Sequence, residues 1–519
     1  MHNRSRTEYS VINILTGLGG YVLNTVLGFV CRMVFVRCLS ADYLGVNGLF
    51  TNIITMLSLA ELGIGSAIGY ALYKPLAQND EEKIASLMQL YRKAYRIIGV
   101  FISVIGLVLM PFINVIIQEQ PNISENIYLL YILNLFNTVS TYFWGYRTTL
   151  LTNAQKNYIV AAISYVISVV QSILQMVFLL LFRNYLGYLL IQTAGNFLYK
   201  ILVSYFAEKH YPCIKKKDIR PLPKDEQRVI FANVRDLMIY KLASLLVNST
   251  DNILITFFNG LATTGIASNY TLLVNTLNSL LGQIFNGLTA SIGNHNVSES
   301  AEKRYQMFSF LNMMNFWIFG WAALGIFFCS SDLVQLCFGE EYVLSLEIPF
   351  VMALNFFTVG MMNAIWTYKH TLGLFHYGRF IQFFTGIANI FFSVLLGTYW
   401  GLFGILSATF VARAMTSLWY DPYAVYKYGF GRCPWEYAKK IAKYVATLLT
   451  AAALCQLSFS LVHGSHAVRT LLKIVLCSVV TNGVFVTVFH KTDEFGMLRT
   501  YLHRIWINIR RRKNGRDKG

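Results

Sequence analysis

Long apolar segments separated by short polar connections recur along the whole chain. Each segment holds about twenty residues, the length that an α-helix needs to cross roughly 30 Å of hydrocarbon. The pattern predicts about fourteen membrane-spanning helices. The predicted spans are 11–36, 44–72, 94–117, 126–150, 158–182, 185–206, 236–258, 266–291, 306–329, 346–368, 378–398, 401–420, 441–462 and 468–489.

The composition agrees with this pattern. Of the 519 residues, 55% are hydrophobic and 13% are charged, and the mean hydropathy is +0.49. A soluble chain of this size does not carry so many apolar residues in blocks of span length. The first block is too long for the core of a signal peptide and no small-residue cleavage motif follows it, so we expect a retained span. The sequence therefore predicts an all-α polytopic membrane protein.

The basic residues predict the orientation. The net charge is +18, but the 43 Lys and Arg residues do not gather as on a nucleic-acid-binding domain. If the N-terminus is cytoplasmic, and charges within two residues of a span end are counted with the adjoining connection, 34 of them fall in inside connections and six within spans. Only Arg37, Arg183 and Arg469 are then counted outside. Connections rich in Lys and Arg remain on the cytoplasmic side of a membrane. We expect a membrane protein with both termini in the cytoplasm and no nucleic-acid partner.

The longest connection predicts the domain boundary. It is rich in Lys and Arg and falls after six spans and before eight. We expect it to bind anionic lipid headgroups as a topology determinant, or to dock cytoplasmic enzymes. The predicted parts are an N-terminal lobe (1–206), a basic cytoplasmic linker (207–235), a C-terminal lobe (236–425), two further spans (426–489) and a basic cytoplasmic tail (490–519).

A weak internal repeat relates the two predicted lobes. Residues 44–52, LGVNGLFTN, open the second span, and residues 264–271, TGIASNYT, open the eighth, six helices later. Both stretches begin outside and run inward. The lobes are therefore expected to be parallel repeats about an axis along the membrane normal.

Small and polar residues follow one face of the first two spans of each lobe. Such residues also mark ordinary helix packing in membranes. Asparagines and charges on the same faces instead need water or a partner, which favours a hydrated cavity shared by four helices. In the first span the stripe recurs at helical steps, at Asn13, Gly17, Gly20, Asn24, Gly28 and Arg32.

Depth separates the charges within spans. Arg32 and Lys241 lie within reach of an interface, where long cations extend to the headgroups. Four charges lie deeper, roughly 12 to 18 residues from the entry side, and are the stronger candidates for function because a buried charge is costly. These four are Glu61, Lys200, Asp251 and Arg413.

Motifs that would indicate an enzyme are missing from the sequence. It contains no GxxxxGK[ST] phosphate loop, no HExxH and no GxSxG, and no connection is large enough for an ATP-binding domain. We therefore expect neither catalysis nor a cofactor.

Three stretches resemble a known family. They are DYLGVNGLF at 42–50, LSLAELGIGSAI at 57–68 with YALYKPLA at 70–77, and VNSTDN at 247–252. The chain resembles the Wzx-type oligosaccharide flippases of Gram-positive bacteria, which are polysaccharide transporters of the MOP (MATE-like) superfamily. This resemblance implies two six-helix lobes around a V-shaped cavity, plus two C-terminal helices, in a bacterial plasma membrane. It also implies a substrate of oligosaccharide units linked to undecaprenyl pyrophosphate.

The resemblance also suggests roles for the polar residues. Basic side chains suit the pyrophosphate, because guanidinium and ammonium groups pair well with it where water is scarce, and asparagines suit sugar hydroxyls. Glu61 and Asp251 either couple transport to protons or sodium, or pair with nearby cations. The candidates for the pyrophosphate are Arg32, Lys200, Lys241 and Arg413, and those for the sugars are Asn248, Asn275 and Asn278.

Three alternatives remain open at the level of sequence. A MATE-type cation-coupled drug exporter or a lipid II-type flippase would share the fold. In a third alternative, the chain recruits glycosyltransferases or a polymerase of the same pathway through its basic linker and tail. Six basic and two acidic residues lie more than two residues from a span end, and this balance favours an anionic substrate over organic cations.

Overall fold

We describe the protein from a computed structural model of the full chain. The structure describes residues 6–57, 64–113, 117, 122–154, 156–216, 219–231, 234, 250–298, 300–372, 374, 377–378, 380–460, 462 and 464–500.

The described part of the chain is helical and contains no strand. Its principal α-helices are α1 (Arg6–Cys38), α2 (Ala41–Leu57), α3 (Ile64–Gln78), α4 (Glu81–Leu109), α6 (Ile127–Trp144), α7 (Tyr146–Asn153), α8 (Asn157–Phe182), α9 (Tyr185–His210), α11 (Asp251–Ser298), α12 (Ala301–Phe338), α13 (Glu347–Thr371), α14 (Ile381–Met415), α15 (Ser417–Ala424), α16 (Trp435–Phe459) and α17 (His466–Phe489). The 3-10 helices are η2 (Met110–Phe112), η3 (Pro212–Lys215) and η4 (Glu340–Tyr342), and η6 (Val425–Phe430) is a π-helix.

Eight helical stretches in the described residues are long and apolar enough to cross a membrane. Helices α8, α9, α13 and α17 begin within two residues of predicted spans. Helix α4 instead begins thirteen residues before its predicted span, because Asp80 caps it and its first turns are polar. The predicted fold class, an all-α polytopic membrane protein, is confirmed.

Two glycines turn the chain back within the continuous ranges of α11 and α14. Gly260 (φ 83°, ψ 169°) and Gly401 (φ 53°, ψ −131°) adopt backbone angles that a β-carbon disfavours. The hydroxyl groups of Thr256 and Thr264, one on each side of Gly260, share a hydrogen bond of 2.9 Å. In an unbroken helix, residues eight apart would lie about 12 Å apart. Each range is therefore two helices joined by a tight turn, as the spans predicted on either side of each glycine require.

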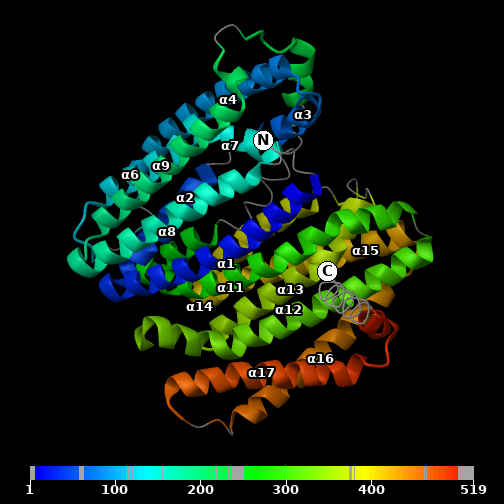
Figure 1. Cartoon of the computed structure of the whole chain (residues 1–519). Helices are drawn as coiled ribbons and strands as arrows, with labels where there is room; N and C mark the ends of the chain where they lie inside the picture. The colour runs from blue at the N-terminus through cyan, green and yellow to red at the C-terminus, as the bar shows by residue number, and fades with distance from the viewer. Residues whose placement is uncertain are drawn as a thin grey trace, which may run out of the picture. The chain divides into compact units, whose positions relative to one another are not determined.

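The chain divides into two compact units, residues 1–268 and 269–519. In the first, α1 packs along α8, which packs along α9, and α6 packs between α4 and α9. The colours of Figure 1 follow these helices from blue to green.

The segment that follows α9 folds back on the first unit. Cys213 in η3 is 1% exposed, and the Ser86 hydroxyl of α4 donates to the backbone oxygen of Arg220 at 2.7 Å. The ammonium of Lys156 lies 5.0 Å from the ring centre of Tyr211. The described part of the predicted linker is therefore packed against the lobe that precedes it.

In the second unit, an aromatic core attaches the two C-terminal helices to α12. The ring of Phe316 stacks on that of Tyr444 in α16, with the ring centres 4.4 Å apart, and its centre lies 4.7 Å from that of Phe485 in α17. All three side chains are 4% exposed or less. Helices α16 and α17 run side by side in Figure 1.

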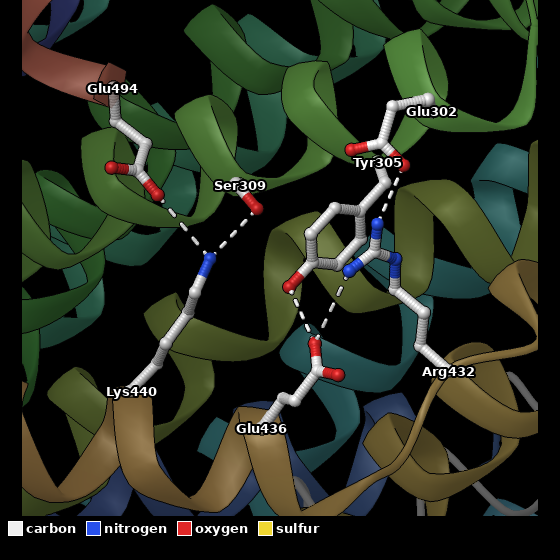
Figure 2. A network of polar contacts seen from close by, with 7 residues as sticks. All are labelled: Glu302, Tyr305, Ser309, Arg432, Glu436, Lys440 and Glu494. Atoms are coloured by element: carbon white, nitrogen blue, oxygen red, sulfur yellow. Dashed lines mark hydrogen bonds and ion pairs between the residues drawn. The ribbon is translucent and has the colours of Figure 1, made fainter. Parts of the chain in front are cut away.

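A polar network continues this attachment at one end of α12 (Figure 2). The guanidinium of Arg432 lies 3.9 Å from the ring centre of Tyr305, and one of its nitrogens is 2.6 Å from a carboxylate oxygen of Glu302. The Lys440 ammonium donates to Ser309 at 2.8 Å and to Glu494 at 3.3 Å. The network thus connects α12, α16 and the segment after α17.

Candidate substrate-binding residues

Arg32 connects α1 to α11 within the first unit. Its guanidinium donates to the hydroxyl oxygen of Ser268. That hydroxyl in turn donates to the backbone oxygen of Gly265 at 2.6 Å, so its lone pairs are available to the guanidinium. Both side chains are half-buried. Arg32 is thus linked to Ser268, eight residues after the turn at Gly260 in α11.

The predicted stripe on α1 has two different environments. A β-carbon on Gly20 would overlap the ring of Tyr165 in α8, at 1.8 Å, so this glycine is needed for packing. At Gly28, two turns later, no atom lies within 4 Å of the position that a β-carbon would take. The Asn24 side-chain oxygen between them is buried and has no hydrogen-bond partner among the described residues. Helix packing thus explains Gly20 but not Asn24 and Gly28.

Lys200 lies inside the first unit between α9 and α6. The residue is 7% exposed, and its ammonium donates to the backbone oxygen of Asn137 at 3.0 Å and to the Ser140 hydroxyl at 2.7 Å. No carboxylate in the described part of the chain is within ion-pair distance of it. Burying an ammonium costs several kcal/mol, and these two neutral acceptors offset only part of that cost.

Asp251 is the first residue of α11. It is half-buried, and its position at the helix N-terminus stabilises a negative charge. A β-carbon on Gly48 of α2 would lie 3.8 Å from the side-chain nitrogen of Asn252, the residue after Asp251. The turn that carries Asp251 therefore packs beside α2, which holds the second predicted stripe.

The remaining candidates divide into two groups. Glu61, Lys241 and Asn248 lie outside the described residues. Asn275, Asn278 and Arg413 belong to the second unit, where Asn275 is exposed and Asn278 and Arg413 are half-buried. Contact among all nine residues stays a prediction.

Two ion-paired carboxylates, one buried and one half-buried, were not among the candidates from the sequence. Asp421 in α15 is 1% exposed, pairs with Lys369 of α13 at 2.6 Å and accepts a hydrogen bond from Trp366 at 3.1 Å. Glu208 in α9 bridges Arg147 at 2.8 Å and Lys215 at 2.7 Å. Each lies just beyond a predicted span and so counts as a loop residue by hydropathy. Opposite charges at the ends of neighbouring spans are the signal that would have found them.

The comparisons with known proteins decide the family. Residues 10–293, more than half of the chain, match the model of a family described as "Polysaccharide biosynthesis protein". The chain belongs to the polysaccharide biosynthesis protein family. No curated protein sequence matches it. The resemblance drawn from the sequence is thus confirmed at the level of the family.

Solved structures of two transporter types are similar to this member of the polysaccharide biosynthesis family. The lipid II flippase MurJ in an inward closed conformation shares 14% identity over 92% of this chain and 99% of its own, with a TM-score of 0.62. An inward-facing MATE multidrug transporter of the MOP superfamily shares 17% identity over 77% and 94%, with a TM-score of 0.53. A mutant of the Vibrio cholerae MATE transporter VcmN shares 14% identity over 83% and 99%, with a TM-score of 0.50. At these identities the likeness shows the fold alone.

Proposed function

We propose that this protein moves oligosaccharides linked to a polyprenyl pyrophosphate from the cytoplasmic to the outer face of the plasma membrane, for the assembly of a surface polysaccharide. Two observations together carry the proposal: residues 10–293 match a polysaccharide-biosynthesis family, and 92% of the chain is similar in fold to a lipid flippase. It acts as a transporter rather than an enzyme, with both termini in the cytoplasm.

The charges within the spans support an anionic substrate. Arg32 is held by a serine hydroxyl, and Lys200 lies among neutral oxygens with no carboxylate of the described chain near it. A pyrophosphate offers these cations charge-assisted hydrogen bonds. The MATE-like fold supports drug export equally well, but an exporter of organic cations requires acidic or aromatic groups where this chain places Arg32 and Lys200.

The transport step follows from the fold class. In the proposed cycle the two predicted lobes, residues 1–206 and 236–425, rock about a central cavity and expose it to each side in turn. The remaining candidates, Glu61, Lys241, Asn248, Asp251, Asn275, Asn278 and Arg413, line that cavity in this proposal. Glycosyltransferases and a polymerase of the same pathway supply and consume the substrate.

The proposal is tested by transport in proteoliposomes. The purified chain is reconstituted with a fluorescent polyprenyl-pyrophosphate oligosaccharide, and movement between leaflets is followed by a quencher that cannot cross the membrane. We expect transport by the wild type and a loss of at least about tenfold in Arg32→Gln, as for an interaction worth about 1.4 kcal/mol or more. Arg37→Gln, an exposed change in the last turn of the same helix, is the matched control.

One result would contradict the proposed transport, and a second would contradict the role of Arg32 in it. The first is no movement of the labelled lipid by a wild-type protein that exports an organic cation from the same vesicles. The second is equal transport by Arg32→Gln and Arg37→Gln, which would separate Arg32 from the substrate. The thermal unfolding midpoint of each variant shows whether a loss of transport reflects a loss of folded protein.

A further inference from the structure

The first unit contains a basic cavity of about 390 Å³. It lies where α4, α7 and the segment after α9 meet. Cavities that bind small ligands range from about 300 to 1,000 Å³. Four cations line this one, Arg92, Arg147, Lys215 and Lys216, together with Gln89 and the ring of Tyr146.

Two of the cations are held in place by one carboxylate. Glu208 accepts from Arg147 at 2.8 Å with one oxygen and from Lys215 at 2.7 Å with the other. The Arg147 side chain is 19% exposed, and its Nε is buried with no hydrogen-bond partner among the described residues. A buried donor without an acceptor is costly. The Nε is closed to the cavity, so other parts of the Arg147 side chain line it.

The other two cations leave the cavity with an excess of positive charge. Arg92 is exposed and has no ion pair in the described part of the chain. Lys216 is 3.7 Å from Glu81, and both side chains are about two-thirds exposed, so solvent weakens this pair. Two carboxylates therefore face four cations.

The cavity is formed by elements that are fixed to one another. Cys213 in η3 is 1% exposed, and the Ser86 hydroxyl holds the backbone of Arg220 against α4 at 2.7 Å. Tyr146, which forms one side, is 5% exposed. Basic groups held in advance lose less entropy when an anion binds than mobile surface lysines do.

The sequence of α4 sets the depth of the cavity in the membrane. Arg92, Lys93 and Arg96 are exposed on this helix. From the next residue onward the exposed positions are apolar, with Ile97 71% and Val100 57% exposed, as on a face that contacts lipid tails. The change from basic to apolar lies at the level of the headgroups, and the predicted orientation places it in the cytoplasmic leaflet.

We propose that this cavity is a binding site for the phosphate of an anionic lipid headgroup. The exposed Arg92 guanidinium donates to the phosphate oxygens, because the planar guanidinium matches two phosphate oxygens at once, and the Arg147 side chain adds a second fixed positive charge to the cavity. Lys215 and Lys216 add charge at the rim. This site goes beyond the proposed transport function and does not depend on it.

The proposal is tested by binding to the purified full-length chain in neutral detergent. Short-chain phosphatidylglycerol is titrated while the thermal unfolding midpoint is recorded, with short-chain phosphatidylcholine, inorganic phosphate and pyrophosphate in parallel. The variants are Arg92→Gln and Arg147→Gln. Lys93→Gln is the matched control, because it removes an equal charge from the next residue of α4, which does not line the cavity.

The expected result is a saturable rise in the unfolding midpoint with phosphatidylglycerol alone. Removing one guanidinium should weaken this binding about tenfold, as for the loss of a charge-assisted hydrogen bond, while Lys93→Gln should bind like the wild type. Arg92 is exposed, so Arg92→Gln tests the site even if Arg147→Gln folds poorly.

Two results would overturn the proposal. If Lys93→Gln weakens binding as much as Arg92→Gln, the attraction is that of a diffuse basic surface. If inorganic phosphate or pyrophosphate produces the same shift and competes with phosphatidylglycerol, the site takes a soluble anion and the lipid assignment is wrong.

Discussion

Gly265 of α11 lies directly against Gly45 of α2. A β-carbon on Gly265 would be 2.9 Å from the backbone nitrogen of Gly45 and 2.2 Å from the backbone oxygen of Ala41. A β-carbon on Gly45 would be 2.1 Å from the backbone oxygen of Leu261. The two helices therefore touch backbone to backbone, and each glycine belongs to one copy of the internal repeat.

This contact predicts a steric effect of one methyl group. Gly265→Ala should lower the free energy of unfolding by about 1 to 3 kcal/mol, the usual cost of overpacking, because backbone atoms cannot move aside cheaply. Thermal unfolding in detergent measures it. Gly28→Ala is the control, since nothing lies within 4 Å of its β-carbon position and alanine favours a helix. Equal midpoints for the two variants would contradict the contact.

The repeat illustrates how far the sequence predicts this fold. Similar residues at 44–52 and 264–271 indicate two related helices, and hydropathy places most spans. Hydropathy carries no information about which helices touch, so the approach of Gly45 to Gly265 was not predicted. Spans also begin earlier in the structure where polar first turns are capped, as Asp80 caps α4.

The site residues were predictable to a smaller extent. Their types and helical spacing follow from the sequence, but their partners depend on tertiary packing. Lys200 is bound by Ser140 of α6, sixty residues away, and hydropathy cannot reveal such a partner. The ion pair of Lys369 with Asp421 was missed because both residues fall just beyond predicted spans.

The Glu125 carboxylate predicts a pH dependence of stability. It accepts hydrogen bonds from the Tyr43 hydroxyl at 2.5 Å, from Ser124 at 2.9 Å and from the backbone of Tyr185 at 3.1 Å. It therefore joins α2 and α9 to the segment that precedes α6. Partial burial raises the pKa of Glu125, but these hydrogen bonds outweigh it and hold the pKa below its ordinary value of 4.5. The ionised carboxylate therefore stabilises the fold above pH 4.5, and this contribution is lost as the pH falls through the lowered pKa.

We expect Glu125→Gln to lower stability at pH 7 by about 1.5 to 3 kcal/mol, the usual contribution of a hydrogen bond to a charged group. Thermal unfolding from pH 7 to pH 3 measures the difference between variant and wild type. It should shrink below pH 4.5, as the wild-type carboxyl takes up a proton. A constant difference across this range would show that hydrogen bonding to the ionised form is unimportant.

The buried pair of Lys369 and Asp421 predicts strong coupling between two substitutions. Asp421→Asn leaves the Lys369 ammonium, 14% exposed, without its counterion, and should cost about 3 to 5 kcal/mol. Adding Lys369→Met should recover most of this loss, because no unpaired charge remains. Chemical unfolding of both single variants and the double variant gives the coupling energy.

An exposed pair in the same unit provides the control. Glu302, 60% exposed, pairs with Arg432 (Figure 2), and Glu302→Gln should cost about 1 kcal/mol or less. If Asp421→Asn is no more harmful than Glu302→Gln, the Lys369 ammonium does not depend on Asp421.

Lys200 predicts a separation of stability from transport. Lys200→Met removes a buried ammonium whose acceptors are neutral, Ser140 and the Asn137 backbone, so folding should be nearly unchanged or improved. If the ammonium binds the pyrophosphate, transport should fall at least about tenfold, which corresponds to an interaction of about 1.4 kcal/mol. Flipping of the labelled lipid and thermal unfolding are measured on the same preparation. Ser140→Ala keeps the charge and removes one acceptor, so it should lower stability while transport per folded molecule is retained. A stable Lys200→Met protein with wild-type transport would assign Lys200 to helix packing alone.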